Sequence, residues 1–220
     1  MQTIRTSVKT TLLILTTLAL SATFSRAASY SSTNLQSDIP GVAANTDPNL
    51  VNPWGMTANS TGSVIWVSDN GTGVSTLYRQ DGTALSLVVT IPTSARNKDG
   101  GTPTGIVFNN TGFFKVMLNG NSQTSLFIFV SEDGSISGWN PNVDLTNAII
   151  AVDNGTNNGT NRAVYKGATL GVANGHNFLY VTNFHSGHVE TYDENFQQVN
   201  PNGFVDSNIP AGFAPLVSKI

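Results

Sequence analysis

The chain has 220 residues, no cysteine, 21 glycines and only 10% charged residues, with a net charge of −3. This composition excludes a disulfide scaffold and lacks the basic clusters that bind nucleic acid, so we expect no nucleic-acid partner. The hydrophobic fraction is 39% and is gathered in short runs between turns rich in Gly, Asn and Ser. That pattern indicates a folded, turn-rich all-β protein.

The N-terminal segment is typical of an export leader. Basic residues precede an apolar run over residues 11–22, and small residues flank a signal-peptidase site that ends at Ala27. The run is shorter than the roughly 20 apolar residues of a membrane span. We therefore predict a signal peptide over residues 1–27 and a mature domain over residues 28–220, with no transmembrane segment after cleavage. The protein would be secreted, or periplasmic or on the cell surface in a bacterium.

After a polar lead-in, the chain repeats one plan. A Pro-x-Gly turn opens an inner strand, and a continuous apolar strand then ends in a polar turn. The period is about 50 residues, because Gly55 recurs as Gly105 and Val130 recurs as Val181. Four strands in roughly 40–50 residues match one propeller blade. The predicted blades span residues 52–91, 102–140 and 165–197, with the start of a fourth over residues 203–220.

In each predicted blade, one apolar strand is expected to be buried on both faces. Its equivalent residues are Trp66 and Val67, Phe129 and Val130, and Tyr180 and Val181. In a closed propeller the first strand often completes the last blade, and we expect residues 33–37 to supply that strand.

Several motifs carry a family resemblance. The Pro-x-Gly openings and their spacing resemble NHL-type β-propeller repeats, and residues 180–183, Tyr-Val-Thr-Asn, are similar to the signature of YVTN propellers. Residues 34–43, 47–55, 69–75 and 208–215 together resemble a secreted, uncharacterised bacterial-type propeller family with an Asn-Pro-Trp-Gly opening motif.

The resemblance implies an NHL-like β-propeller, six blades in full-length relatives, and no established activity. Members of that family continue for further blades, so this chain resembles an N-terminal partial copy. It would have about three blades plus the start of a fourth, which is an incomplete ring. Uncovered apolar blade faces would then favour self-association or aggregation of the partial ring. The alternative is a compact three-blade monomer whose faces are capped by the Asn-rich connection over residues 153–161, and light scattering separates the two.

Candidate ligand and metal residues lie beside the turns. A tryptophan that follows an exposed turn can stack on a sugar, and two histidines share one turn, although each also fits an ordinary structural position. The candidate ligand-binding residues are Asn52, Trp54, Asn183, His185 and His188. Two identical Asp-Asn-Gly-Thr strings begin at Asp69 and Asp153. Such oxygen-rich loops hold calcium in some proteins and are plain turns in others, so calcium is the one cofactor that the pattern suggests.

Five Asn-x-Ser/Thr sites are candidate glycan acceptors if the source is eukaryotic. They are Asn59, Asn70, Asn109, Asn154 and Asn158.

The sequence holds no signature of nucleophilic catalysis: there is no cysteine and no Gly-x-Ser-x-Gly elbow. We interpret the chain as an exported propeller that binds a protein, a carbohydrate or a component of the cell envelope, rather than as an enzyme. The alternative is a metal-dependent propeller hydrolase or lyase with its site in the central channel, because a fold alone does not decide function. Stoichiometric calcium or zinc that is lost on changing Asp69 or His185 would favour that alternative.

Overall fold

The computed structural model describes residues 30–95, 97, 100–155, 162–204, 208–210 and 212–216. The expected signal peptide and Asn158 lie outside this part. Contacts divide the chain into residues 1–33 and residues 34–220, and every described strand belongs to the second unit. Within the described part, no helix is long and apolar enough to cross a membrane.

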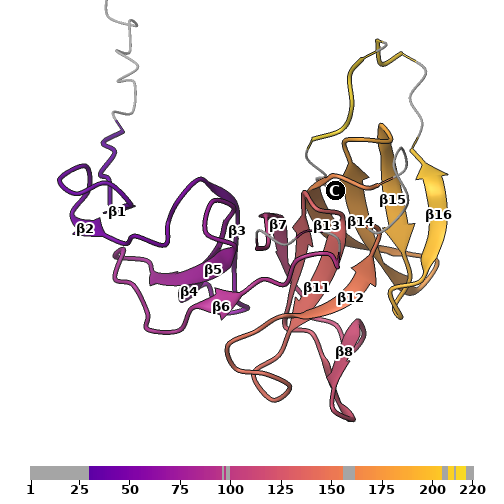
Figure 1. The fold of residues 1–220 in the computed structure, drawn as a ribbon, viewed down its shortest axis with the longest axis horizontal. Helices are drawn as coiled ribbons and strands as arrows, with labels where there is room; N and C mark the ends of the chain where they lie inside the picture. Colours follow the sequence, from indigo (N-terminus) through magenta and orange to yellow (C-terminus); the bar gives the residue numbers. More distant parts are fainter. Residues whose placement is uncertain are drawn as a thin grey trace, which may run out of the picture. The chain divides into compact units, whose positions relative to one another are not determined.

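The described part of residues 34–220 contains three four-stranded antiparallel sheets (Figure 1). The first is β3 (Pro53–Ala58), β4 (Val64–Asp69), β5 (Val74–Arg79) and β6 (Val89–Thr90). The second is β7 (Pro103–Phe108), β10 (Phe127–Ser131), β11 (Ser135–Trp139) and β12 (Ile149–Asp153). The third is β13 (Tyr165–Ala173), β14 (His176–Asn183), β15 (His188–Tyr192) and β16 (Gln198–Gly203).

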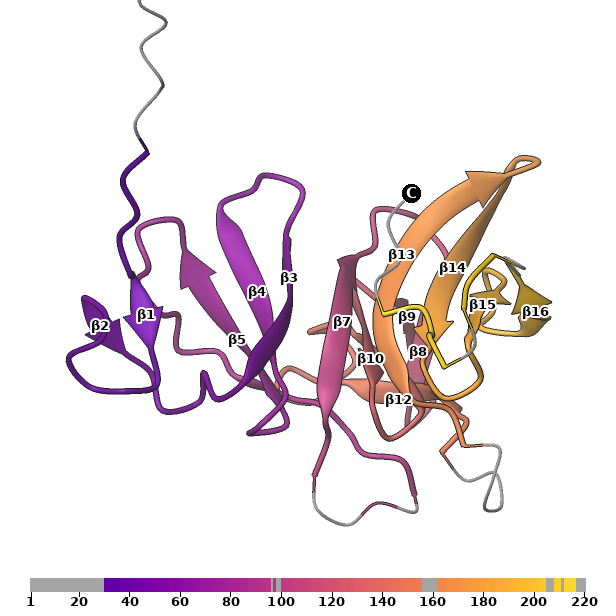
Figure 2. The same ribbon diagram turned by 90° about the horizontal axis from the view of Figure 1, so that it is seen from above.

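The innermost strands of the three sheets lie side by side, with β7 between β3 and β13 (Figure 2). Their close approach explains the repeated glycine. A Cβ on Gly55 would collide with the carbonyl oxygen of Thr104, and one on Gly105 would lie 2.9 Å from Val130 Cγ2 and 2.9 Å from the Ala168 nitrogen. Successive four-stranded sheets that meet at their inner strands are the blades of a β-propeller. The fold is therefore all-β and of the propeller type, as the sequence predicts.

Two hydrophobic cores fill the spaces between neighbouring sheets. Side chains of β10 alternate between them: Phe127 and Phe129 belong to the core shared with the first sheet, and Ile128 and Val130 to the core shared with the third. Because successive strand residues point to opposite faces, a strand with a core on each side must be apolar throughout. The continuous apolar run of the middle blade follows from this position.

One of the predicted core residues is not buried. Tyr180 is only half-buried, whereas its neighbour Val181 is fully buried against the second sheet. The Tyr180 ring lies on the other face of the third sheet, with ring centroids 6.3 Å from Phe178 and 5.4 Å from Phe204. The prediction failed here because it assumed a packed sheet on both faces of every blade.

The lead-in segment docks on the first sheet. Its strand β1 (Gln36–Ser37) pairs in parallel with β2 (Asn45–Thr46), and both lie against the first sheet. Gln36 Nε2 donates to the Gly82 carbonyl oxygen at 2.8 Å, and Tyr78 Oη donates to Asp47 Oδ2 at 2.8 Å. The missing side chain of Gly82 makes room for the chain, because a Cβ there would lie 2.6 Å from Leu35 Cβ. In this structure residues 36–37 therefore pair with β2 and pack on the first sheet, and their part in closing a complete ring stays a prediction.

The sheets also extend beyond the expected blade limits. The fourth strand of the second sheet is β12, past residue 140, and the fourth strand of the third sheet is β16, which ends at Gly203. Before β12, Asp144 Oδ1 accepts the N–H groups of Thr146 and Asn147, both at 2.9 Å, and these bonds stabilise the turn that leads to the pairing of β12 with β11. A hairpin of β8 (Lys115–Leu118) and β9 (Asn121–Thr124) is inserted after β7. After Gly203, the described residues contain no further strand.

Candidate functional site

A chain of polar contacts links the three blades where their inner strands begin. Asn52 Nδ2 donates to Asn70 Oδ1 at 3.1 Å, and Asn70 Nδ2 donates to Glu132 Oε2 at 3.0 Å. Glu132 Oε1 in turn forms an ion pair with Lys166 Nζ. That ammonium lies 4.5 Å from the centre of the Trp54 ring. We call these five residues the axial cluster.

The axial cluster is built from equivalent positions of the repeat. Pairing of Pro53 with Asp69, and of Tyr165 with Asn183, puts Trp54 and Lys166 at the same step of their inner strands. Burial alone would raise the pKa of Glu132, but hydrogen bonds from Lys166 and Asn70, together with the Lys166 charge, hold that pKa below its usual value. Glu132 therefore stays ionised.

The cluster borders a cavity of about 270 Å³. Its walls are the inner strands, and Trp54 and Lys166 share them with Leu216 from the C-terminal segment. Trp54 is 42% exposed, so an aromatic surface remains available beside the bound ammonium.

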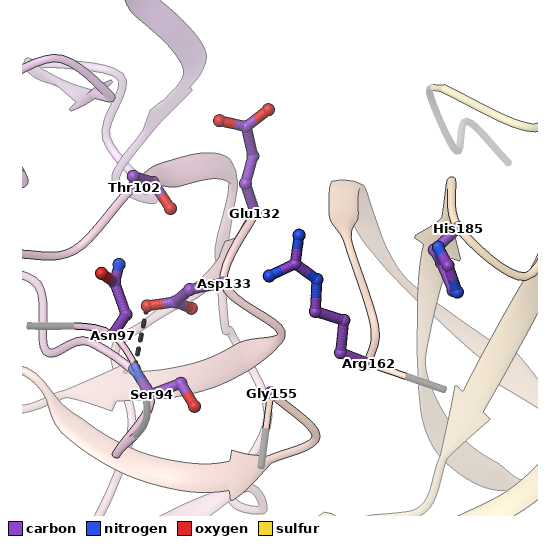
Figure 3. A pocket seen from close by; sticks show the side chains of 8 residues that line it. All are labelled: Ser94, Asn97, Thr102, Glu132, Asp133, Gly155, Arg162 and His185. Carbon is purple, nitrogen blue, oxygen red and sulfur yellow. Dashed lines mark hydrogen bonds between the residues drawn. The ribbon is translucent and has the colours of Figure 1, made fainter. Parts of the chain in front are cut away.

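A larger polar pocket of about 620 Å³ lies beside the axial cluster and shares Glu132 with it (Figure 3). Its walls come from the connection between the first two sheets, the β10–β11 turn, the connection before β13, and the β14–β15 turn. The lining residues are Ser94, Asn97, Thr102, Glu132, Asp133, Gly155, Arg162 and His185. Its volume falls in the range of about 300–1,000 Å³ that is typical of small-molecule sites.

The aspartate side chains around this pocket accept hydrogen bonds from neighbouring residues of the protein. Asp133 Oδ1 accepts the N–H and hydroxyl of Ser135 at 3.0 and 2.7 Å, and its Oδ2 accepts the Thr93 hydroxyl and the Ser94 N–H, both at 2.8 Å. Asp153 accepts the Ser94 hydroxyl at 2.6 Å and the N–H groups of Ala95 and Gly155 at 3.0 and 3.1 Å. These carboxylates shape the loops of the pocket.

The sequence-predicted ligand residues fall into different environments. Asn52 and Trp54 belong to the axial cluster, and His185 lines the polar pocket. Asn183 is buried: its Oδ1 accepts the N–H of Val164 at 3.1 Å and of His185 at 3.1 Å, and its Nδ2 is engaged with a buried glutamate. His188 begins β15 and does not line the pocket. The structure thus brings together three of the five residues, in two adjoining sites.

The two aspartates proposed for a metal belong to different sheets, Asp69 to β4 and Asp153 to β12. Asp69 is fully buried, and its Oδ2 accepts the N–H of Thr76 at 3.0 Å and its hydroxyl at 2.7 Å. Burial raises the pKa of Asp69 to about 7, against the lowering effect of the Thr76 hydrogen bonds, and the charge of Asp47 raises it further. In the part of the chain that the structure describes, no three His, Cys, Asp or Glu side chains gather as a metal site.

Each of the four candidate glycan acceptors that the structure describes donates a hydrogen bond from its side-chain nitrogen. Asn109 is buried, and its Nδ2 donates to the carbonyl oxygens of Phe113 and Ser125 at 3.0 and 2.8 Å. Asn154 Nδ2 donates to the hydroxyls of Tyr165 and Tyr192 at 2.7 and 2.8 Å. A glycan on either nitrogen would break these bonds. Asn70 Nδ2 is likewise used in the axial cluster. Asn59 lies in the β3–β4 turn, where its Nδ2 donates to Ser63 Oγ at 3.5 Å.

Sequence reasoning did not single out Glu132, Lys166 or Arg162 as site residues. Alignment of the repeats could have revealed the first two: Lys166 stands where the first blade has Trp54, and Glu132 stands where it has Asn70. Charged residues at positions beside a turn, in a chain with so few charges, are such a signal. Arg162 lies in a connection outside the repeat, where no periodic signal exists.

No model of a known protein family matches the chain. It is similar to uncharacterized proteins of Acanthamoeba polyphaga mimivirus. One is 32% identical over 178 residues, which cover 79% of this chain and 45% of that protein. A second is 30% identical over 177 residues, which cover 79% of this chain and 42% of that protein. The chain thus spans less than half the length of these relatives.

Solved propeller structures show more distant likenesses. A virginiamycin B lyase from Staphylococcus aureus aligns with a TM-score of 0.43 and 16% identity, over 66% of this chain and 39% of that one. Regucalcin, a calcium-binding protein from Agrobacterium tumefaciens strain C58, aligns with a TM-score of 0.26 and 10% identity, over 68% of this chain and 73% of that one. Neither likeness bears on the chemistry of this chain.

Proposed function

We propose that the chain is an exported β-propeller-type binding module whose polar pocket holds a carbohydrate. The observation that carries this proposal is the pocket itself: about 620 Å³, walled mainly by polar side chains from turns of the second and third sheets and from the connections before them. Hydroxyl-rich ligands need many hydrogen-bond donors and acceptors in one concave site, and the loops at the ends of the inner strands supply them. Trp54, which is 42% exposed and lines the separate cavity of about 270 Å³, adds an aromatic surface for a sugar ring.

Binding is favoured over the metal-dependent hydrolase or lyase. The carboxylate oxygens of Asp133 and Asp153 accept hydrogen bonds from loop residues. Asp69 is buried and hydrogen-bonded to Thr76 rather than presented to a cavity. A metal-dependent enzyme would need several carboxylates or imidazoles converging on one point.

The binding proposal is tested by changing one side chain of the pocket wall. His185 is exposed at the β14–β15 turn and lines the pocket, so His185→Ala changes a surface position and leaves both hydrophobic cores untouched. We expect His185→Ala to weaken binding of disaccharides in calorimetric titrations at least about threefold, as loss of one modest contact does. His176→Ala, at the exposed β13–β14 hairpin, is the matched control. Absence of saccharide binding by the unaltered protein would refute the proposal.

Export is a further part of the proposal, and it depends on the leader. We expect protein recovered outside the producing cell to lack residues 1–27, because the apolar run and the small residues before the cleavage point suit a signal peptidase. N-terminal sequencing of that protein checks this. A secreted product that starts at Met1 would contradict it.

A further inference from the structure

The lining of the polar pocket includes one charged group that is not engaged. Arg162 is exposed in the connection between β12 and β13, and Figure 3 shows its side chain extending into the pocket between Asp133 and His185. Among the residues that the structure describes, its guanidinium forms no hydrogen bond and no ion pair. An arginine fork has five N–H donors, and here they face a cavity rather than a protein partner.

The acidic side chains of the same pocket are satisfied from within. Glu132 is paired with Lys166 and also accepts Asn70, and Asp133 accepts four hydrogen bonds from Thr93, Ser94 and Ser135. Their oxygens hold the protein together, so they offer little to a ligand cation. A charged ligand would therefore meet the guanidinium of Arg162 rather than the carboxylates of the pocket.

We infer that the pocket selects an acidic saccharide, whose carboxylate is held by the guanidinium of Arg162; this inference rests on the proposed carbohydrate-binding function. A planar guanidinium matches a carboxylate with two parallel N–H···O bonds, a geometry that an ammonium cannot reproduce. The rest of the ring lies against the amides and hydroxyls of Asn97, Thr102 and Ser94, which line the same pocket. A uronic acid unit has this combination of one carboxylate and several hydroxyls.

The inference can be tested with a saccharide whose charge is removed without changing its skeleton. Calorimetric titrations of the full chain at low salt would compare digalacturonate, its dimethyl ester and inorganic phosphate alone. We expect digalacturonate to bind at least about tenfold more tightly than the ester, because charge-assisted hydrogen bonds are about twice as strong as neutral ones. Arg162→Gln should lose that tenfold preference, and Arg162→Lys should keep only part of it.

Arg79→Gln is the matched control, since Arg79 is an exposed arginine at the end of β5, away from the pocket. It should bind digalacturonate as the unaltered protein does. Equal binding of the acid and the ester, or full binding by Arg162→Gln, overturns the acidic-ligand inference while carbohydrate binding itself survives. Phosphate that binds as tightly as digalacturonate overturns the saccharide part of the inference. Failure of both saccharides to bind refutes the proposed function as well.

Discussion

Val130→Asp should prevent the chain from folding. Val130 is fully buried on β10, in the core between the second and third sheets, which also contains Ile136, Leu179 and Val181. A carboxylate there has no partner, and the desolvation cost of an unpaired polar or charged group is at least several kcal/mol. That cost is comparable to the whole stability of a typical domain, about 5–15 kcal/mol. We therefore expect insoluble protein or the loss of a cooperative thermal transition.

Two further variants serve as a milder test and as an exposed control for this prediction. Val130→Ala removes two methyl groups and should lower the free energy of unfolding by about 1–3 kcal/mol, which denaturant titration measures if the aspartate variant does not fold. Val172→Asp makes the same chemical change on β13, where the side chain is 72% exposed, and should change stability by less than about 0.5 kcal/mol. Soluble Val130→Asp protein with an unaltered melting temperature would contradict the assigned strand register.

Periodic features of the sequence predicted the all-β, propeller-type fold. The apolar run at residues 126–130 and the Gly55 to Gly105 spacing follow directly from a strand with a core on each face and an inner strand with a close neighbour. Non-periodic features were harder. The docking of β1 on the first sheet depends on the contact between Leu35 and Gly82. The local sequence around either residue does not predict this contact.

The candidate site was predicted only in part, for a related reason. Asn52 and Trp54 stand out because they flank a turn, but Glu132 and Lys166, which complete the axial cluster, come from two other blades. Only the approach of β3, β7 and β13 brings these four side chains together. The turn histidines looked equivalent in sequence, yet strand pairing places His185 at the pocket and His188 in β15. The position of each residue relative to the sheet, rather than its type, decides its role.

Asp69 makes the stability of the fold depend on pH. Its carboxyl group is fully buried on β4, and its Oδ1 has no hydrogen-bond partner in the part of the chain that is described. Burial raises its pKa to about 7, whereas an aspartate in an unfolded chain titrates near 3.9. Between these two values the folded state binds a proton that the unfolded state does not. Stability should therefore be greatest below about pH 4, as far as this group is concerned, and should fall as the pH rises to about 7.

We expect Asp69→Asn to remove this dependence. The Asn Oδ1 can accept both hydrogen bonds from Thr76, as Asp69 Oδ2 does, while the side chain stays neutral at every pH. The variant should match the unaltered protein near pH 4 and exceed its free energy of unfolding above pH 7, by up to roughly 4 kcal/mol at 1.36 kcal/mol per pKa unit. Denaturant titrations from pH 4 to pH 8 measure the difference in free energy of unfolding between the two proteins. Carboxylates with lowered pKa values, such as Glu132, make stability rise with pH, but both proteins contain them, so their effect cancels in the difference. Asp38→Asn, a change of the same net charge in the loop between β1 and β2, controls for overall charge. Parallel pH profiles for the Asp69→Asn and unaltered proteins would show that the buried carboxyl is not protonated in the folded state.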